Sequence, residues 1–288
     1  MADCWVSGLR RVIDLAGART FGNALRRLQD MMHRIFTLSL LLGLAGSLAA
    51  ESKFATTDWP NWRGLTSDGQ AKFVKGLPTE WSEIKNVVWK TPIPGRGHST
   101  PTLVGDRIYL ATAEEDEMYQ SVICLDKATG KPVWETRVHE SQFAVGLNKH
   151  ASHAGTAVVH DGERLYVNFV IGNQAYASAL GLDGKLLWQK PIGKYKVHQG
   201  YGSSPMVFGD IVVVKADTKI GGVICGLDKK TGREIWRQER PKLPNYTTPV
   251  VIEAAGKQQM VFCGCELVTS LDPLTGKKLW EVPGSTEE

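Results

Sequence analysis

The stretch Leu125-Asp126-Lys127-Ala128-Thr129-Gly130-Lys131-Pro132-Val133-Trp134 decides the fold, because it returns three more times along the chain. The later copies occupy residues 182–188, 227–236 and 271–280, and the first of these is shortened to Leu-Asp-Gly-Lys-Leu-Leu-Trp. Self-similarity at a regular spacing is the sequence signature of a repeat architecture. The sequence therefore predicts a repeat protein.

Each copy predicts a β-hairpin. An apolar strand ends at Leu-Asp, a turn follows, and the outgoing strand carries Trp. An Asp side chain can accept a hydrogen bond from the backbone two residues on, and Gly adopts a positive φ at no steric cost, so Asp-x-x-Thr-Gly forms a turn. In the shortened copy, Asp183-Gly184 is a two-residue hairpin signal. A Trp that recurs once per repeat is predicted to pack between neighbouring sheets. The predicted structural signature comprises Asp126, Gly130, Trp134, Asp183, Gly184, Trp188, Asp228, Gly232, Trp236, Asp272, Gly276 and Trp280.

A second hairpin precedes each turn, so the repeat contains four strands. The spacings between successive signature Trp residues are 54, 48 and 44 residues. A period of about 40 to 50 residues with four strands per unit is typical of a β-propeller blade. We therefore predict an all-β propeller of four-stranded blades. The predicted blades are residues 99–138, 152–193, 201–240 and 245–284.

The N-terminal region resembles an export signal. A basic head, Met31-Met32-His33-Arg34, precedes an apolar run that ends in small residues at Ala49-Ala50. The run is shorter than the roughly 20 residues that span a membrane, so residues 31–50 are predicted to be a cleaved signal peptide. Residues 1–30 then form a leader or an extension ahead of the true start. The mature protein is expected to be exported, periplasmic or associated with the cell envelope, soluble, and without a transmembrane span.

Residues 51–85 are predicted to form an irregular segment, the strap, with Trp59, Trp62 and Trp81 as anchors. Residues 86–93 follow it and look like an outer strand without a blade, because Trp89 lies 45 residues before Trp134. We expect this strand to close a propeller. The region 86–284 would then be a partial propeller of about four blades plus this closing strand, and residues 285–288 a short tail.

The charge excludes one class of partner. The net charge is +4, but the first 50 residues contain six Arg and three Asp, which leaves the remainder close to neutral. Nucleic-acid binding relies on a basic surface that neutralises phosphates. We therefore expect no nucleic-acid partner.

The repeat resembles the pyrroloquinoline quinone (PQQ)-like repeat family of β-propellers. The likeness rests on the signature Leu-Asp-x-x-Thr-Gly-Lys-x-x-Trp and covers residues 59–283. The opening Trp-Pro-Asn-Trp-Arg-Gly at residues 59–64 resembles exported bacterial members without an established enzymatic role, such as the outer-membrane assembly propeller. The resemblance implies a non-catalytic binding or assembly scaffold with an envelope protein or peptide as partner. Family propellers have roughly six to eight blades, so this chain is predicted to be a truncated member; a dimer of half-rings is the alternative.

The other function that the resemblance implies is a PQQ-dependent alcohol or sugar dehydrogenase. Such enzymes hold the cofactor over a disulfide between adjacent cysteines, with Ca²⁺ bound by Glu and Asn and with Asp as the base. This sequence has no adjacent cysteines, and in the close pair Cys263-Gly264-Cys265 a disulfide would be strained. We therefore predict no catalytic residue, metal site or cofactor, and assign PQQ and Ca²⁺ only to the dehydrogenase alternative.

Histidines and a tyrosine gather before the innermost strands. His98, His153 and Tyr246 align in the repeat frame, and His150 and His198 lie in longer loops nearby. These five residues are predicted to surround one mouth of the central channel. Neutral imidazoles there could bind a metal or an anionic ligand. The alternative is that they form hydrogen bonds to the loop backbone.

Overall fold

The computed structural model describes residues 53–71 and 75–284. The leader predicted at residues 1–30, the signal peptide predicted at residues 31–50 and the tail predicted at residues 285–288 lie outside the described residues.

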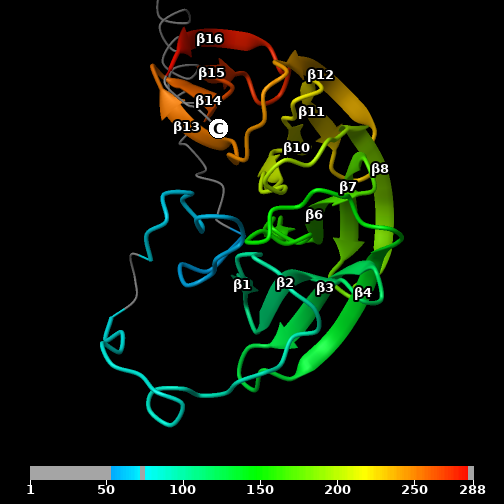
Figure 1. The fold of residues 1–288 in the computed structure, drawn as a ribbon. Coiled ribbons are helices and arrows are strands. Elements are labelled where there is room, and N and C mark those ends of the chain that lie inside the picture. Colours follow the sequence, from blue (N-terminus) through cyan, green and yellow to red (C-terminus); the bar gives the residue numbers. More distant parts are fainter. Residues whose placement is uncertain (1–52, 72–74, 285–288) are drawn as a thin grey trace, which may run out of the picture. The chain divides into compact units, whose positions relative to one another are not determined.

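The described residues form sixteen strands in four antiparallel sheets, and we find no helix among them. Each sheet follows the chain order, with its first strand at one edge and its fourth at the opposite edge (Figure 1). This arrangement confirms the predicted all-β propeller of four-stranded blades. The first sheet contains β1 (Thr102–Val104), β2 (Arg107–Glu114), β3 (Tyr119–Asp126) and β4 (Pro132–Glu140); the second β5 (Val159–His160), β6 (Arg164–Ile171), β7 (Gln174–Gly181) and β8 (Leu186–Lys194); the third β9 (Met206–Phe208), β10 (Ile211–Ala216), β11 (Gly222–Asp228) and β12 (Glu234–Arg240); the fourth β13 (Val250–Ala254), β14 (Lys257–Gly264), β15 (Leu267–Leu271) and β16 (Lys278–Pro283).

The signature turn between the third and fourth strands forms by the predicted chemistry. The Asp126 carboxylate accepts hydrogen bonds from the backbone N–H of Thr129 at 2.9 Å and from its hydroxyl at 2.7 Å. Gly130 donates its N–H to the Asp126 carbonyl at 2.8 Å and has a φ of +70°. The hydrogen bonds from the Thr129 hydroxyl and N–H to the carboxylate lower the pKa of Asp126. Asp and Gly are therefore required at their positions by the turn itself.

Three signature Trp residues, and Trp89 before the first sheet, each contact the turn glycine of the sheet that follows them. A Cβ atom on Gly232 would lie only 2.7 Å from Cε3 of Trp188, so the indole rests directly on the backbone. The Trp188 indole also donates its N–H to the Lys229 carbonyl of the same turn at 3.1 Å. The prediction that Trp packs between sheets is confirmed. The four contacts are Trp89 on Gly130, Trp134 on Gly184, Trp188 on Gly232 and Trp236 on Gly276.

The last signature Trp differs from the others. Trp280 has no following turn among the described residues, and its indole donates to Gln259 Oε1 of its own sheet at 2.7 Å. Its side chain is 39% exposed, whereas Trp188 and Trp236 are buried. The Trp280 indole thus donates to an acceptor in its own sheet, whereas the Trp188 indole donates to the turn of the next sheet.

The hydrophobic core lies between adjacent sheets. Residues of the second and third sheets, including Tyr166, Val212 and Val214, form the largest cluster. Separate clusters join the first sheet to the second and the third to the fourth. Cys124 and Cys225 are buried in these interfaces as free thiols. Side chains point alternately to the two faces of a strand, and the second and third sheets are packed on both faces, so their middle strands β6, β7, β10 and β11 are almost wholly buried.

Two sequence expectations for the region before the first sheet require correction. Residues 86–93 form no strand in the structure, because no neighbouring strand pairs with them. Trp89 nevertheless donates to the Lys127 carbonyl at 2.9 Å, and Thr91 donates to the Gly130 carbonyl at 2.7 Å. Trp81 is 71% exposed and anchors nothing, whereas Trp59 pairs with Leu103 of β1.

Substitution of a turn glycine tests the contact between sheets. Gly232→Ala places a Cβ against Trp188 at a φ of +68°, and we expect a loss of about 3 kcal/mol in the free energy of unfolding, from left-handed strain plus the clash. Gly172→Ala is the matched control, since its φ is +57° and nothing lies within 4 Å of the new Cβ. The control should lose only about 1 kcal/mol. If urea unfolding gave equal losses of stability for the two variants, the packing of Trp188 would not depend on the absence of a side chain at position 232.

A buried histidine makes stability depend on pH. His139 on β4 lies against the rings of Phe169 and Tyr176, and burial lowers its pKa to about 4. The unfolded chain binds this proton near pH 6.5, so the stability that neutral His139 contributes is complete above that pH and is lost as the pH falls towards 4. Relative to His139→Phe, the native chain should lose about 2 kcal/mol of stability between pH 7.5 and pH 5. A difference that urea unfolding finds constant with pH would contradict this expectation.

Candidate functional site

The predicted binding residues lie in the loops that lead into the inner strands. His98 precedes β1, His153 precedes β5 and Tyr246 precedes β13. His98 is exposed, and its backbone N–H donates to the Ala154 carbonyl of the next loop at 2.9 Å. Neighbouring loops are therefore joined through their backbones.

The structure brings two of the five predicted residues together. His198 Nδ1 lies 3.3 Å from the Tyr246 hydroxyl, which also accepts a hydrogen bond from the Gln199 N–H at 3.2 Å. His153 instead stacks on Phe143 with ring centroids 4.2 Å apart, and burial lowers its pKa. His150 is exposed. Within residues 53–71 and 75–284 there is no group of three His, Cys, Asp or Glu side chains that could hold a metal ion.

A groove of about 500 Å³, the loop-face groove, lies beside the Phe143–His153 stack. Its lining is mostly apolar, with lysines at the rim. Val145 and Ile220 are exposed here, at 89% and 47%. No periodic pattern marks these residues in the sequence, because they lie in irregular loops. The lining consists of Gln142, Phe143, Ala144, Val145, Gly172, Asn173, Lys194, Tyr195, Lys196, Val197 and Ile220.

Hydrogen bonds between loops hold the loop-face groove in shape. The Tyr195 N–H donates to the Asn173 carbonyl at 2.8 Å, and the Gly172 N–H donates to the Gln142 carbonyl at 3.1 Å. Thr218 joins a third loop, since its hydroxyl accepts from the Lys196 N–H and donates to the Lys196 carbonyl. The groove is thus a surface formed by loops whose backbone groups are paired.

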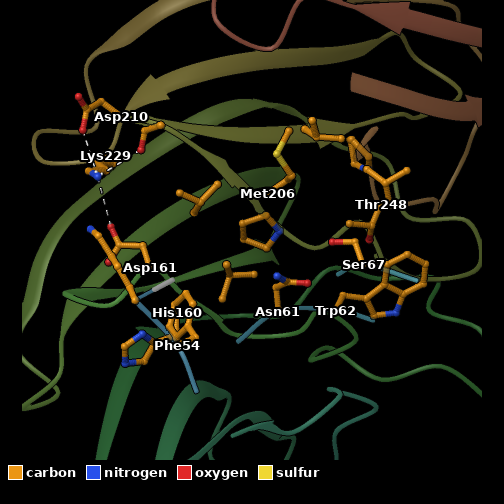
Figure 2. A pocket seen from close by; sticks show the side chains of 18 residues that line it. Phe54, Asn61, Trp62, Ser67, His160, Asp161, Met206, Asp210, Lys229 and Thr248 are labelled. Atoms are coloured by element: carbon orange, nitrogen blue, oxygen red, sulfur yellow. Dashed lines mark hydrogen bonds and ion pairs between the residues drawn. The ribbon is translucent and has the colours of Figure 1, made fainter. Parts of the chain in front are cut away.

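A second concave surface, the inner pocket, has a volume of about 510 Å³ (Figure 2). It lies between the strap and the inner strands β5, β9 and β13. Met206 projects into its centre, with Trp62 and Ser67 at one end and Asp161 at the other. The full lining is Lys53, Phe54, Asn61, Trp62, Ser67, Val159, His160, Asp161, Pro205, Met206, Val207, Gly209, Asp210, Lys229, Thr248, Pro249, Val250 and Val251.

The strap is held on the first two inner strands by its backbone. Trp59 donates its N–H to the Leu103 carbonyl at 2.6 Å and accepts from the Leu103 N–H at 3.0 Å. The next residue, Pro60, accepts from the His160 N–H of β5 at 2.8 Å. The Asp58 carboxylate accepts from the Gly105 N–H at 3.0 Å. Consecutive strap residues therefore bond to two neighbouring sheets.

At the polar end of the inner pocket, the charged side chains are paired with one another. Lys229 Nζ lies 3.0 Å from Asp210 and 3.9 Å from Asp161, and it lowers the pKa of Asp210 (Figure 2). The Tyr166 hydroxyl donates to Asp161 at 3.0 Å, and burial raises the pKa of Tyr166. His160 Nδ1 accepts from the Gly162 N–H, so a neutral ring carries its proton on Nε2. Burial lowers the pKa of His160, which favours that neutral form.

Comparison with known proteins identifies the family. A family profile described as outer membrane protein assembly factor BamB matches residues 64–200 and 120–288, which together cover most of the chain. The chain belongs to this family. Its membership agrees with the predicted PQQ-like repeat propeller.

Two curated relatives carry different activities in their names. The outer membrane protein assembly factor BamB of Burkholderia pseudomallei is 29% identical over 224 residues, which are 74% of this chain and 51% of that protein. The quinoprotein glucose dehydrogenase of Escherichia coli is 29% identical over 231 residues, which are 65% of this chain and 28% of that protein. The chain thus spans about half the length of the BamB relative and less of the dehydrogenase.

Solved structures agree on the fold. BamB from Moraxella catarrhalis has a TM-score of 0.50 at 18% identity, over 69% of this chain and 55% of that one. The quinohemoprotein alcohol dehydrogenase from Comamonas testosteroni has a TM-score of 0.52 at 15% identity, over 82% of this chain and 42% of that one. At such identities the likeness concerns the propeller fold alone.

The chain's own residues fit a quinone cofactor poorly. The resemblance to quinoprotein dehydrogenases implies adjacent cysteines joined as a disulfide. Cys124, Cys225, Cys263 and Cys265 are free thiols, and no two of them are adjacent. Burial raises the pKa of Cys265 to about 11, so this thiol is held in its neutral form. We therefore derive no reaction step through such a cofactor.

The charge set of the inner pocket can be tested by removing its cation. In Lys229→Met the buried Asp161 carboxylate keeps its hydrogen bonds but loses its ammonium partner, and we expect the free energy of unfolding to fall by about 1–3 kcal/mol. Lys230→Met is the matched control, since Lys230 is the exposed neighbour in the same turn and should change stability by less than about 0.5 kcal/mol. Urea unfolding of both variants measures the effect, and similar values would contradict it.

Proposed function

We propose that this chain is a non-catalytic binding or assembly scaffold of the cell envelope and that the loop-face groove is its protein-binding surface. The observation that carries the proposal is the exposed apolar pair Val145 and Ile220 in a groove whose loops are fixed by hydrogen bonds. Exposed apolar groups rimmed by polar side chains mark interaction sites. Rigid loops also lose little conformational entropy on binding, which favours affinity.

The rim of the groove suggests the chemistry of the partner. Lys194 and Lys196 line the groove and are exposed, and no hydrogen bond or ion pair of their ammonium groups is found in the described residues. A polypeptide segment with apolar residues at its centre and Asp or Glu at its ends complements this surface. The family supports an envelope protein as the source, because its description concerns the assembly of outer membrane proteins.

The histidines predicted at the channel mouth become part of this proposal. His153 lies beside the groove through its stack on Phe143, and the His198–Tyr246 pair is held by the neighbouring loop.

The proposed cellular location rests on the sequence of residues 31–50, which implies export and a soluble mature protein. In residues 53–71 and 75–284 we find no helix with the length and hydropathy needed to cross a membrane.

Site-specific photo-crosslinking in the native host tests the binding surface. A photoreactive residue at position 145 should capture one acidic envelope protein. The same residue at position 88 should not, although Val88 and Val145 are equally exposed, at 89% each. With the captured protein purified, Val145→Glu should weaken binding at least about tenfold by placing a charge in the groove, while Val88→Glu leaves it unchanged. Equal capture from both positions would contradict the proposal.

A second function, PQQ-dependent oxidation of an alcohol or sugar, is favoured by the matches to dehydrogenases, among them a quinoprotein glucose dehydrogenase and a quinone-dependent 1-butanol dehydrogenase. Dye reduction by the purified protein with PQQ, Ca²⁺ and glucose or ethanol distinguishes the two functions. We expect no turnover. Turnover above that of PQQ and Ca²⁺ alone would refute the non-catalytic scaffold.

A further inference from the structure

The four inner strands place one residue each at equivalent positions, as the register of the sheets shows. Each of these residues faces a residue of the second strand, which in turn faces a leucine of the third strand. The equivalent residues are Leu103, His160, Val207 and Val251, which face Ile108, Leu165, Val212 and Met260, and through them Leu125, Leu180, Leu227 and Leu271.

The strap occupies the first two of these positions. Leu103 exchanges both backbone hydrogen bonds with Trp59, and His160 donates its N–H to Pro60. Residues of an antiparallel strand direct their N–H and C=O alternately to one neighbour and to the other. Because Leu103 directs both groups to the strap, the equivalent Val207 and Val251 direct theirs away from β10 and β14.

The backbone groups of these two valines face the inner pocket. Val207 and Val251 both line it, together with Met206, Pro249 and Trp62, and both are only partly buried. The strap therefore fills the space between the edges of β1 and β5, while the corresponding space between the edges of β9 and β13 is a cavity. An unpaired strand edge is a template for pairing with another polypeptide.

We propose that the inner pocket binds an extended polypeptide segment of a partner protein, paired to Val207 and Val251 as residues 59–60 pair to Leu103 and His160. The mode is addition of a strand to a sheet edge, in which backbone hydrogen bonds give affinity and side-chain pockets give specificity. The segment carries apolar side chains towards Met206 and Pro249. This site is separate from the loop-face groove and goes beyond the function proposed for it.

The charges of the pocket favour a peptide over a small anion. Lys229 is already paired with Asp161 and Asp210, and Lys53 Nζ lies 3.8 Å from Glu163, so both lysines that line the pocket already have carboxylate partners. The groups that face the cavity between β9 and β13 are backbone donors and acceptors beside apolar side chains. An extended backbone supplies the complementary acceptors and donors at the spacing of a strand.

The strap itself provides a probe of this mode of binding. We would use acetyl-Thr-Asp-Trp-Pro-Asn-Trp-amide, which repeats residues 57–62, at concentrations up to about 1 mM. Hydrogen exchange followed by NMR should report protection of the Val207 and Val251 amides by at least about fivefold when the peptide is added. The Leu103 and His160 amides should not change. Protection confined to Leu103 and His160, or no protection at all, would overturn the proposal.

Two further variants separate the backbone contact from packing. Val207→Pro removes the N–H that faces the pocket, a substitution that an edge strand tolerates, and it should weaken peptide binding about five- to tenfold. Val207→Ala keeps the N–H and should bind within about threefold of the native chain. Val145→Glu should bind the peptide as the native chain does. The proposal for the inner pocket can therefore hold even if the loop-face groove proves not to bind a protein.

Modification of the peptide keeps the test independent of folding. A peptide methylated at the backbone nitrogen of its first Trp lacks the donor equivalent to the Trp59 N–H. It should bind the native chain about five- to tenfold more weakly than the unmodified peptide. Equal binding of the two peptides would refute strand addition even if Val207→Pro failed to fold.

Discussion

The contact between an indole ring and the turn glycine of the next sheet is the interaction on which the rest of the structure depends. Gly232 has no Cβ and a φ of +68°, so the Trp188 ring can lie on its backbone and donate to the Lys229 carbonyl. One residue type thus serves the turn and the junction at once. The contact fixes the position of each sheet relative to the next one. It thereby aligns the inner edges of the two sheets. Stability in such arrays is carried by interfaces between neighbouring repeats.

The same coupling explains which features were predictable from sequence. Asp126 and Gly130 form the turn by chemistry that is local in the chain, and Trp134 recurs once per repeat, so their roles followed from the residues alone. Trp81 failed as a predicted anchor because an aromatic residue in an irregular segment carries no information about its partner. The loop-face groove and the inner pocket join residues of different sheets, separated by up to about 200 positions, and no local pattern encodes such proximity.

The two concave surfaces differ in the groups that they offer to a partner. The loop-face groove presents side chains, among them Val145 and Ile220, whereas the inner pocket presents the edges of strands beside a lysine that is already paired with two carboxylates. A scaffold with both could hold a folded surface at one and an extended segment at the other. Family membership is compatible with this division, because one propeller fold hosts many functions.

Pro60 has a consequence for the behaviour of the protein at high concentration. Its carbonyl pairs with β5, whereas both backbone groups of Trp59 pair with Leu103 of β1, so at these two residues the opposite sides of the strap are both occupied. Sheets propagate from molecule to molecule through complete rows of donors and acceptors. The strap thus covers two inner edges without creating an equivalent new one. The segment that joins the first two sheets therefore also acts as a barrier to fibrillar association.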